Sequence, residues 1–415
     1  MNKKIGNLFK GDKVIWMVFL FLCLISVVEV FSASSTLTYK SQNYMEPIIK
    51  HASMILFGVF VAIMTLNIPC RYFKLITPFL LLTTGIMLIW VLFFGAKTND
   101  AGRWISLAGF TFQPSELAKG TLVLATAQIL SAMQREDGSG ADPKAMKYIL
   151  IIMGIAAVLI GLENLSTAGL ICAVIIMMMF IGRIPMSQMG KLMGGLVALV
   201  GALIISIMTF GAMDDSANEG EGAETTTEVV AQAPQAKKSS GGMLHRLGTW
   251  RNRIIDFMDH KEVKPEDYDL DKNMQVAHAN IAIVSSNIIG KGPGNSTERD
   301  FLPQAFSDFI YAIVIEEMGI IGAFVVVFLY IILLFRCAII ASRCENNFPA
   351  FLVMGLGLLL ISQATINMLV AVGIFPVTGQ PLPLISKGGT STIINCAYIG
   401  AILSVSRSAK RITNK

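Results

Sequence analysis

The chain has 415 residues, of which 54% are hydrophobic and 15% are charged, and its formal net charge is +5. An ordinary soluble domain carries about 25% charged residues, so this composition excludes that class and indicates a membrane protein. Apolar runs recur, each close to the roughly 20 residues that cross a bilayer. We predict an all-α integral membrane protein with ten transmembrane helices, at residues 14–33, 51–68, 75–95, 117–133, 148–162, 167–181, 192–213, 309–337, 348–372 and 391–406.

The orientation follows from basic residues in the short connections. Lysine and arginine concentrate in the N-terminal segment, in alternate connections and in the tail, and cytoplasmic segments carry such an excess. The short loops of the opposite face hold only Lys40, Lys50, Lys97, Arg103 and Lys387. We therefore expect both termini in the cytoplasm and one long extracytoplasmic loop between helices 7 and 8. The predicted regions are a cytoplasmic segment 1–13, helices 1–7 in 14–211, the loop 212–307, helices 8–10 in 308–406 and a cytoplasmic tail 407–415.

The first apolar run and the cysteines suggest no covalent processing. That run is too long for a cleavable signal peptide and lacks a small-residue cleavage site, so we take it as the first span. The six cysteines fall within predicted spans or near the cytoplasmic face. We expect neither a disulfide framework nor a metal cluster.

The long outside loop divides by composition. Residues 214–242 have few large apolar side chains and are predicted to be a disordered insert. Residues 245–257 have an amphipathic pattern that fits a helix in the outer membrane interface or an ordinary packing helix. Residues 273–283 predict a helix with Gln275 on one face. The glycine-rich stretch 290–296 lacks the spacing of a phosphate loop, so we interpret it as a tight turn.

Asp308 is the most informative single residue. It lies where the loop gives way to an apolar helix, and a charged side chain at the start of a span usually marks a pathway or a reaction centre. The alternative is a helix cap made by Ser307 and Asp308.

Two further outside segments carry polar chemistry. Glu116 and Lys119 are three residues apart at the start of the fourth span, where they can pair on one face of a helix. They are either part of a site or a salt-paired structural helix start. Lys387, Gly388 and Gly389 follow a proline-rich loop and lead into the last span. Free N–H groups at that helix start, beside a lysine, predict an anion site for a phosphate or pyrophosphate.

Three blocks of residues carry a family resemblance. They are Gly102-Arg-Trp with Pro114-Ser-Glu-Leu-Ala-Lys119, Phe309-Ile-Tyr-Ala with Glu316-Glu-Met-Gly319, and Gly373 followed by Pro381-Leu-Pro and Ser386-Lys-Gly-Gly-Thr-Ser391. In this order, over nearly the whole chain, they resemble the SEDS family of cell-wall polymerases. The resemblance implies a peptidoglycan glycosyltransferase that polymerises lipid II into glycan strands at the outer face of the cytoplasmic membrane and releases undecaprenyl pyrophosphate.

The resemblance also implies roles for particular residues. The aspartate that the family requires matches Asp308, which we expect to be catalytic. The expected substrate-binding residues are Arg103, Glu116, Lys119, Gln275, Lys387, Gly388 and Gly389. No cofactor is assigned, and a divalent cation such as Mg²⁺ stays open. The family's Pro-Asp-Leu-Gly-Thr motif reads Glu163-Asn-Leu-Ser-Thr167 here, so no role is carried over to it.

The expected partners are lipid II, the growing glycan strand, membrane lipids and a class B penicillin-binding protein, which is an FtsI-like transpeptidase. The N-terminal extension favours the division branch of the family, FtsW, which acts with other division proteins at the division site. The alternatives are an elongation polymerase of the RodA branch, a lipid-linked precursor flippase or transporter, and a scaffold without catalysis. No nucleic-acid partner is expected.

The chemistry of the residues agrees with a glycosyl transfer. Such a reaction needs a base for the acceptor hydroxyl and positive groups for the departing pyrophosphate. Asp308 suits the first role, and Lys387, Lys119 and Arg103 suit the second. Glu316 and Glu317 are expected about two turns deeper than Asp308 and paired within the bundle.

Overall fold

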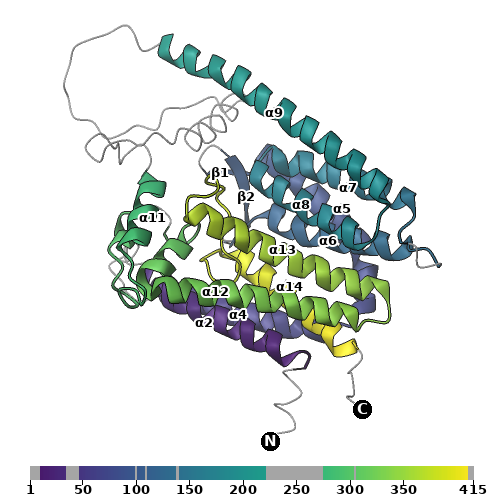
Figure 1. Cartoon of the computed structure of the whole chain (residues 1–415), viewed down its shortest axis with the longest axis horizontal. Helices are drawn as coiled ribbons and strands as arrows, with labels where there is room; N and C mark the ends of the chain where they lie inside the picture. Colours follow the sequence, from purple (N-terminus) through teal and green to yellow (C-terminus); the bar gives the residue numbers. More distant parts are fainter. Residues whose placement is uncertain are drawn as a thin grey trace, which may run out of the picture. The chain divides into compact units, whose positions relative to one another are not determined.

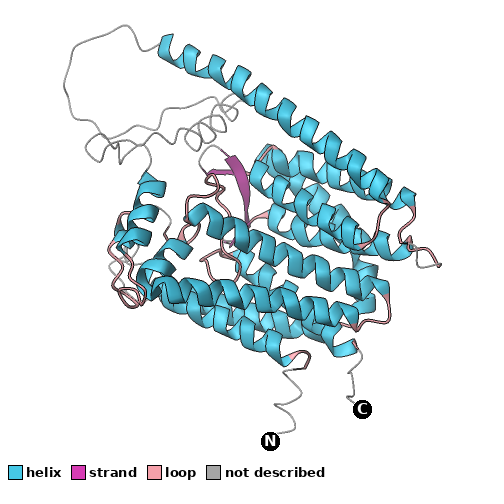
Figure 2. Cartoon of the chain, viewed as in Figure 1, coloured by secondary structure: helices cyan, strands magenta, loops and turns pink. Residues whose placement is uncertain are grey.

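The computed structural model describes residues 10–33, 46–98, 101–107, 110–136, 140–220, 274–302 and 305–409. It divides into two compact units: Met1–Pro185 with Asp269–Lys415, and Met186–Tyr268. Helices make up most of the described chain (Figure 2).

A helix covers most or all of each predicted apolar run. In the first unit these helices are α2 (Lys13–Ala33), α4 (Glu46–Asn67), α5 (Cys70–Phe94), α6 (Pro114–Ala132), α7 (Pro143–Gly161), α8 (Leu165–Ile181), α12 (Ile310–Ser342), α13 (Asn347–Ala371) and α14 (Thr390–Ser408). The second unit holds α9 (Met186–Gly220). By length and composition, seven helices of the described chain can cross a membrane, and α8 is apolar but shorter. The protein is therefore a multi-pass membrane protein, and the count of ten spans stays a prediction.

Two short elements lie in the long loop between the seventh and eighth predicted spans. They are α11 (Met274–Ser285), as the pattern around Gln275 predicts, and a 3₁₀ turn, η1 (Glu298–Asp300). The helix α9 continues to Gly220, whereas we predicted its end at residue 213, so the first part of the predicted disordered insert is helical. The rest of that insert and the predicted interfacial helix 245–257 lie outside the described residues.

A small antiparallel sheet interrupts the helical fold. Its strands are β1 (Ala96–Thr98), β2 (Ala101–Leu107) and β3 (Phe110–Phe112), in the order β1-β2-β3. The all-helical prediction missed it, because three strands this short in one connection give little periodic signal. Strand β2 packs against α5 and α6.

The helices of the first unit pack side by side (Figure 1). Helix α12 lies against α13 and α2, and α14 lies against α4. Large side chains fill the spaces between them, among them Phe19, Leu22, Tyr330 and Ile399, all of them buried. Burial of apolar side chains does not drive helix association in lipid, so this packing relies on close contact and on buried hydrogen bonds.

Helix α12 is two arms rather than one continuous span. Gly319 breaks it with φ 70° and ψ −172°, a backbone conformation open to glycine. The Tyr311 hydroxyl donates a hydrogen bond to the Ala323 carbonyl at 3.3 Å. In a continuous helix those residues would be about 18 Å apart along the axis. The arm Ile310–Met318 therefore folds back against the second arm, and the predicted continuous span 309–337 is wrong on this point.

Hydrogen bonds to helix α2 locate the first arm, Ile310–Met318, along the bundle. Near the end of α2, Ser32 donates a hydrogen bond to the Glu317 carboxylate. Two turns earlier, the Ser26 hydroxyl donates to the Ile385 carbonyl at 2.6 Å. The two serines are about 9 Å apart along the helix axis.

The segment before α12 lies at the height of Ser26 along α2. The Lys387 amide donates to the Phe306 carbonyl at 2.9 Å, so the residues around Phe306 lie beside those around Ile385. Along the axis of α2, Asp308 therefore lies nearer the middle of the helix than Glu317 does, although Glu317 is fully buried and Asp308 is half-buried. We predicted the opposite order, because we extended α12 through Gly319 in one direction.

Candidate functional site

The turn that carries Asp308 is fastened to the loop that carries Lys387. We call residues 305–309 the Asp308 turn and residues 372–389 the proline loop. Besides the Lys387 amide, the Ser386 hydroxyl bonds the turn, donating to the Ser307 carbonyl at 2.6 Å. From α13, the Asn367 amide donates to the Asp308 carbonyl at 2.8 Å. These bonds bring together two predicted site residues that are far apart in the sequence.

The Asp308 side chain is half-buried beside the proline loop. Its Oδ1 accepts a hydrogen bond from the Ser307 hydroxyl at 2.9 Å. Its Oδ2 faces Gly379. A β-carbon added to Gly379 would lie 3.7 Å from this oxygen. The N-cap of α12 is Phe309 and has no side-chain cap hydrogen bond, so the capping alternative for Ser307 and Asp308 is wrong.

Lys387 supplies a half-buried positive charge at the same place. Its ammonium group lies 5.0 Å from the centre of the Phe306 ring, within the range of a cation–π contact. Burial lowers the pKa of Lys387, and the positive charge of Lys50 lowers it further. The neutral form of Lys387 therefore begins to appear at a lower pH than for an ordinary lysine.

The start of α14 adjoins this lysine. Gly389 is its N-cap, with φ 57° and no side-chain cap hydrogen bond. The Ser391 amide donates to the Gly388 carbonyl at 3.1 Å. In the same loop the buried Leu384 has φ 67°, which is a strained conformation for a bulky residue. The turn is therefore held in place by its surroundings, with a glycine where a positive φ is needed.

Glu116 and Lys119 form a buried ion pair. Lys119 Nζ lies 2.7 Å from Glu116 Oε1, and the Lys119 side chain is 0% exposed. The same ammonium donates to Gln363 Oε1 at 2.7 Å. The other end of that amide donates to the Pro381 carbonyl at 3.0 Å. The pair thus supports the proline loop through Gln363, in agreement with the salt-paired helix start we considered, and a direct substrate role stays a prediction.

Arg103 and Gln275 are placed less directly. Arg103 is in β2, and its side chain lies outside the described part of the structure. Gln275 is half-buried near the start of α11, which packs against η1 and α12. The hydrogen bonds of the described residues do not tie it to the Asp308 turn.

Sequence reasoning missed the amides that organise the site. Gln363 and Asn367 are four residues apart on α13, so both lie on one face of that helix. Gln380 Nε2 donates to Thr167 Oγ1 at 2.6 Å. The available signal was two amides at helical spacing within an otherwise apolar run.

The segment Glu163–Thr167, which departs from the family motif, adjoins this site. Thr167 is the acceptor for Gln380, and Asn164 caps α8 by accepting from the Thr167 amide at 3.2 Å. The segment therefore supports the proline loop through Thr167, in addition to the contacts from α13 and the Asp308 turn, although it lacks the family's aspartate.

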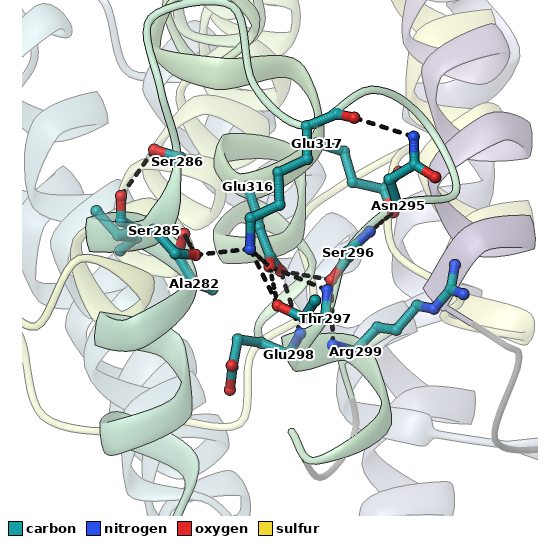
Figure 3. Close-up of polar contacts among 12 residues, drawn as sticks. Ala282, Ser285, Ser286, Asn295, Ser296, Thr297, Glu298, Arg299, Glu316 and Glu317 are labelled. Carbon is teal, nitrogen blue, oxygen red and sulfur yellow. Dashed lines mark hydrogen bonds and ion pairs between the residues drawn. The ribbon is translucent and has the colours of Figure 1, made fainter.

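The glycine-rich stretch binds protein carboxylates instead of forming a plain turn. We call residues 290–299 the glycine loop. Glu316 accepts from Lys291 Nζ at 2.5 Å, from the Thr297 amide at 3.0 Å and from the Ser296 hydroxyl (Figure 3). Glu317 accepts from the Gly294 amide at 3.0 Å. Both carboxylates are buried, but among the described residues only Glu316 forms an ion pair, and most of their partners lie in the glycine loop, whereas we predicted pairing within the bundle.

The glycine loop also closes the break in α12. The Lys291 amide donates to the Glu316 carbonyl at 3.0 Å, and the Gly292 amide donates to the Glu317 carbonyl at 2.8 Å. These carbonyls precede Gly319 and would otherwise lack helical partners. An added β-carbon at Gly290 would lie 2.3 Å from the Glu317 carbonyl oxygen, so the backbones of the glycine loop and of α12 are in direct contact where they cross.

One further buried carboxylate was not anticipated. Glu29 on α2 is 0% exposed, and within the described residues neither of its oxygens has a hydrogen-bond partner. It lies between Ser26, whose hydroxyl is 2.9 Å from His51 Nε2, and Ser32, which bonds Glu317.

No group of three or more His, Cys, Asp or Glu side chains in the described chain is placed to hold a metal ion.

The comparisons with known proteins cover almost the whole chain. The model of a family described as cell cycle protein, FtsW/RodA/SpoVE, matches residues 12–411. A relative from Geobacter sp. (strain M18), a probable peptidoglycan glycosyltransferase FtsW, is 29% identical over 95% of this chain and 96% of its own. The peptidoglycan glycosyltransferase MrdB of Escherichia coli (strain K12) is 27% identical over 97% of this chain and 95% of its own.

Solved structures show the same fold. A chain of a peptidoglycan synthase complex that coordinates polymerization and crosslinking has a TM-score of 0.69 at 22% identity, over 97% of this chain and 99% of that one. The rod shape determining protein RodA of Thermus thermophilus has a TM-score of 0.63 at 20% identity, over 98% and 99%. With a family model that spans nearly all of its residues, this chain belongs to the FtsW/RodA/SpoVE family of cell cycle proteins.

Proposed function

We propose that this protein is a peptidoglycan glycosyltransferase that polymerises lipid II into glycan strands at the outer face of the cytoplasmic membrane. The observation that carries the proposal is the hydrogen-bonded contact between the Asp308 turn and the proline loop. A half-buried carboxylate on one of these segments and a half-buried ammonium group on the other support a shared site. The relatives named peptidoglycan glycosyltransferases support the same reaction.

In the proposed mechanism Asp308 is the general base. It accepts the proton of the acceptor sugar's hydroxyl as the oxygen of that hydroxyl attacks the anomeric carbon of the donor. The bond from that carbon to the pyrophosphate breaks, and undecaprenyl pyrophosphate leaves. One displacement of this kind needs one essential carboxylate, whereas most glycosidases use two.

Positive charge stabilises the leaving group. Lys387 and the N–H groups at the start of α14, next to Gly388 and Gly389, are the proposed pyrophosphate site. Arg103 and Gln275 are proposed to contact substrate. Because the Glu116–Lys119 pair is buried, we propose that it acts on substrate through the loop that it holds.

We further propose that both termini are cytoplasmic and that the protein acts at the division site with a class B penicillin-binding protein. The bias of basic residues supports this orientation. The similarity to a chain of a peptidoglycan synthase complex supports a transpeptidase partner. Depletion of the protein distinguishes the two branches of the family, because filamentous cells support the division role and rounded cells support the elongation role.

The direct test uses the purified full chain in vesicles with lipid II, with and without a class B penicillin-binding protein. Glycan strands are expected from the wild type and not from Asp308→Asn or Asp308→Ala. Asp300→Asn, a change at an exposed carboxylate of η1, is the matched control and should retain activity. Normal strand synthesis by both Asp308 variants would overturn the base assignment. Transfer of lipid II across the vesicle membrane without polymerisation would instead support the flippase alternative.

A further inference from the structure

We propose that Asn367 is a positioning residue that sets the place of the Asp308 carboxylate relative to the proline loop. The inference rests on the proposed function, in which Asp308 is the base. Asn367 is 1% exposed on α13, so its side chain is held within the bundle.

The amide of Asn367 joins two segments that carry no regular structure of their own. Its Nδ2 donates to the Asp308 carbonyl at 2.8 Å and to the Gln380 carbonyl at 2.7 Å. An amide nitrogen has two N–H groups, and both are used. Because only the nitrogen can donate to two carbonyls, the orientation of the amide is fixed by these contacts.

Both carbonyls belong to segments that adjoin the Asp308 carboxylate. One belongs to Asp308 itself. The other belongs to Gln380, the neighbour of Gly379, which faces Asp308 Oδ2. A shift in either carbonyl therefore moves the carboxylate or the wall that it faces.

Helix α13 supplies a rigid base for both contacts. Gln363, one turn before Asn367, donates to the carbonyl of Pro381, the residue after Gln380. Two amides at helical spacing thus hold two successive carbonyls of the proline loop. Of these two amides, only Asn367 also holds the Asp308 turn. This makes it the link between base and loop, whereas Gln363 links the loop to Lys119.

The test replaces the two donors without changing the shape of the side chain. In Asn367→Asp an oxygen faces the two carbonyl oxygens, so both hydrogen bonds are lost. Misplacement of a reacting group by about 1 Å can cost about 100-fold in rate. We expect kcat for lipid II polymerisation to fall about 100-fold with KM nearly unchanged. Asn367→Ser, which keeps one donor, should lose less.

The matched control is Asn67→Asp. Asn67 also donates from its amide to a backbone carbonyl, that of Ile63 at 2.8 Å, but it is exposed at the end of α4. This variant should keep wild-type kcat. Hydrogen exchange in the full chain is the second readout, and the amides of residues 306–309 should exchange faster in Asn367→Asp than in the wild type or in the control.

A pH profile separates positioning from simple packing. The protonated aspartate of Asn367→Asp has one O–H donor, so its kcat relative to the wild type should rise as the pH falls. A constant ratio at all pH values, or wild-type kcat in both Asn367 variants, would overturn the proposal. If Asn367→Asp does not accumulate, wild-type kcat and exchange in Asn367→Ser would overturn it as well.

Failure of the proposed function gives a different result. If Asp308→Asn polymerises lipid II, the base assignment fails whatever the Asn367 variants do. If Asp308→Asn is inactive while Asn367→Asp keeps wild-type kcat and exchange, the positioning inference alone fails.

Discussion

The hydroxyl of Tyr311 donates a hydrogen bond to the carbonyl of Ala323, a residue twelve positions later on what is nominally the same helix. This contact requires the reversal at Gly319 and brings Asp308 into the bundle. A base at that depth is partly shielded from water, which strengthens its interactions with a developing charge.

Because the chain reverses at Gly319, we predict that Gly319→Ala destabilises the protein. The native φ of 70° is unfavourable for alanine, and an added β-carbon would lie 2.3 Å from the Ile288 carbonyl oxygen. We expect a loss of more than about 1 kcal/mol in the free energy of unfolding. Thermal unfolding in detergent measures it. Gly154→Ala on α7 is the control, because nothing lies within 4 Å of its added β-carbon, and equal melting temperatures for the two variants would contradict the argument.

The anion site predicts a difference between charge loss and charge retention at Lys387. Lys387→Glu should raise KM for lipid II or lower turnover, whereas Lys387→Arg should be milder because the charge remains. Gly389→Val should also be damaging, since a β-branched residue is strained at φ 57°. Kinetics at matched protein levels check all three. Wild-type kinetics for Lys387→Glu would leave the loop as a connector and move the search for the phosphate site to Arg103.

The lowered pKa of Lys387 predicts an alkaline limb, a fall at high pH, in the pH profile of kcat/KM. If the charged form binds pyrophosphate, kcat/KM should fall as the pH rises through that pKa, which lies below the ordinary 10.5. Lys50→Gln removes one of the two causes of the shift, so the limb should move to higher pH. Lys387→Arg should remove the limb from the measured range, since arginine stays charged. A limb unchanged in Lys387→Arg would assign it to another group.

The two carboxylates beside Ser32 predict opposite changes in stability. Glu317 accepts from two backbone amides and from Ser32, so Glu317→Gln should lower the free energy of unfolding by about 1–3 kcal/mol. Glu29 has no hydrogen-bond partner among the described residues, and a buried charge without a partner is costly. Glu29→Gln should leave the melting temperature unchanged or raise it. A large loss in Glu29→Gln would reveal a bond essential to the fold.

The sequence predicted those features that depend on local pattern. Hydropathy located the helices, and the spacing of Glu116 and Lys119 predicted their pair. The motifs around Asp308 and Lys387 predicted a shared site, and the structure brings their segments together.

The features that escaped prediction depend on contacts between distant segments. Gly319 lies in an apolar run, where nothing nearby marks a reversal, because the partners that permit it are in the glycine loop. Most donors for Glu316 and Glu317 are likewise in the glycine loop, about twenty residues earlier in the chain, and Ser32 is far earlier still. Asn367 gave a signal, an amide four residues after Gln363 in a largely apolar helix, but its partners could not be read from its neighbours.

The crossing of the glycine loop and α12 limits where the chain can change in length. The Lys291 and Gly292 amides donate to the successive carbonyls of Glu316 and Glu317, so one residue inserted between Gly290 and Lys291 would shift every donor of the loop by one position. The donors of these bonds all lie after α11. Insertions upstream of α11 should leave the geometry around Asp308 intact, so differences in length among family members are expected there.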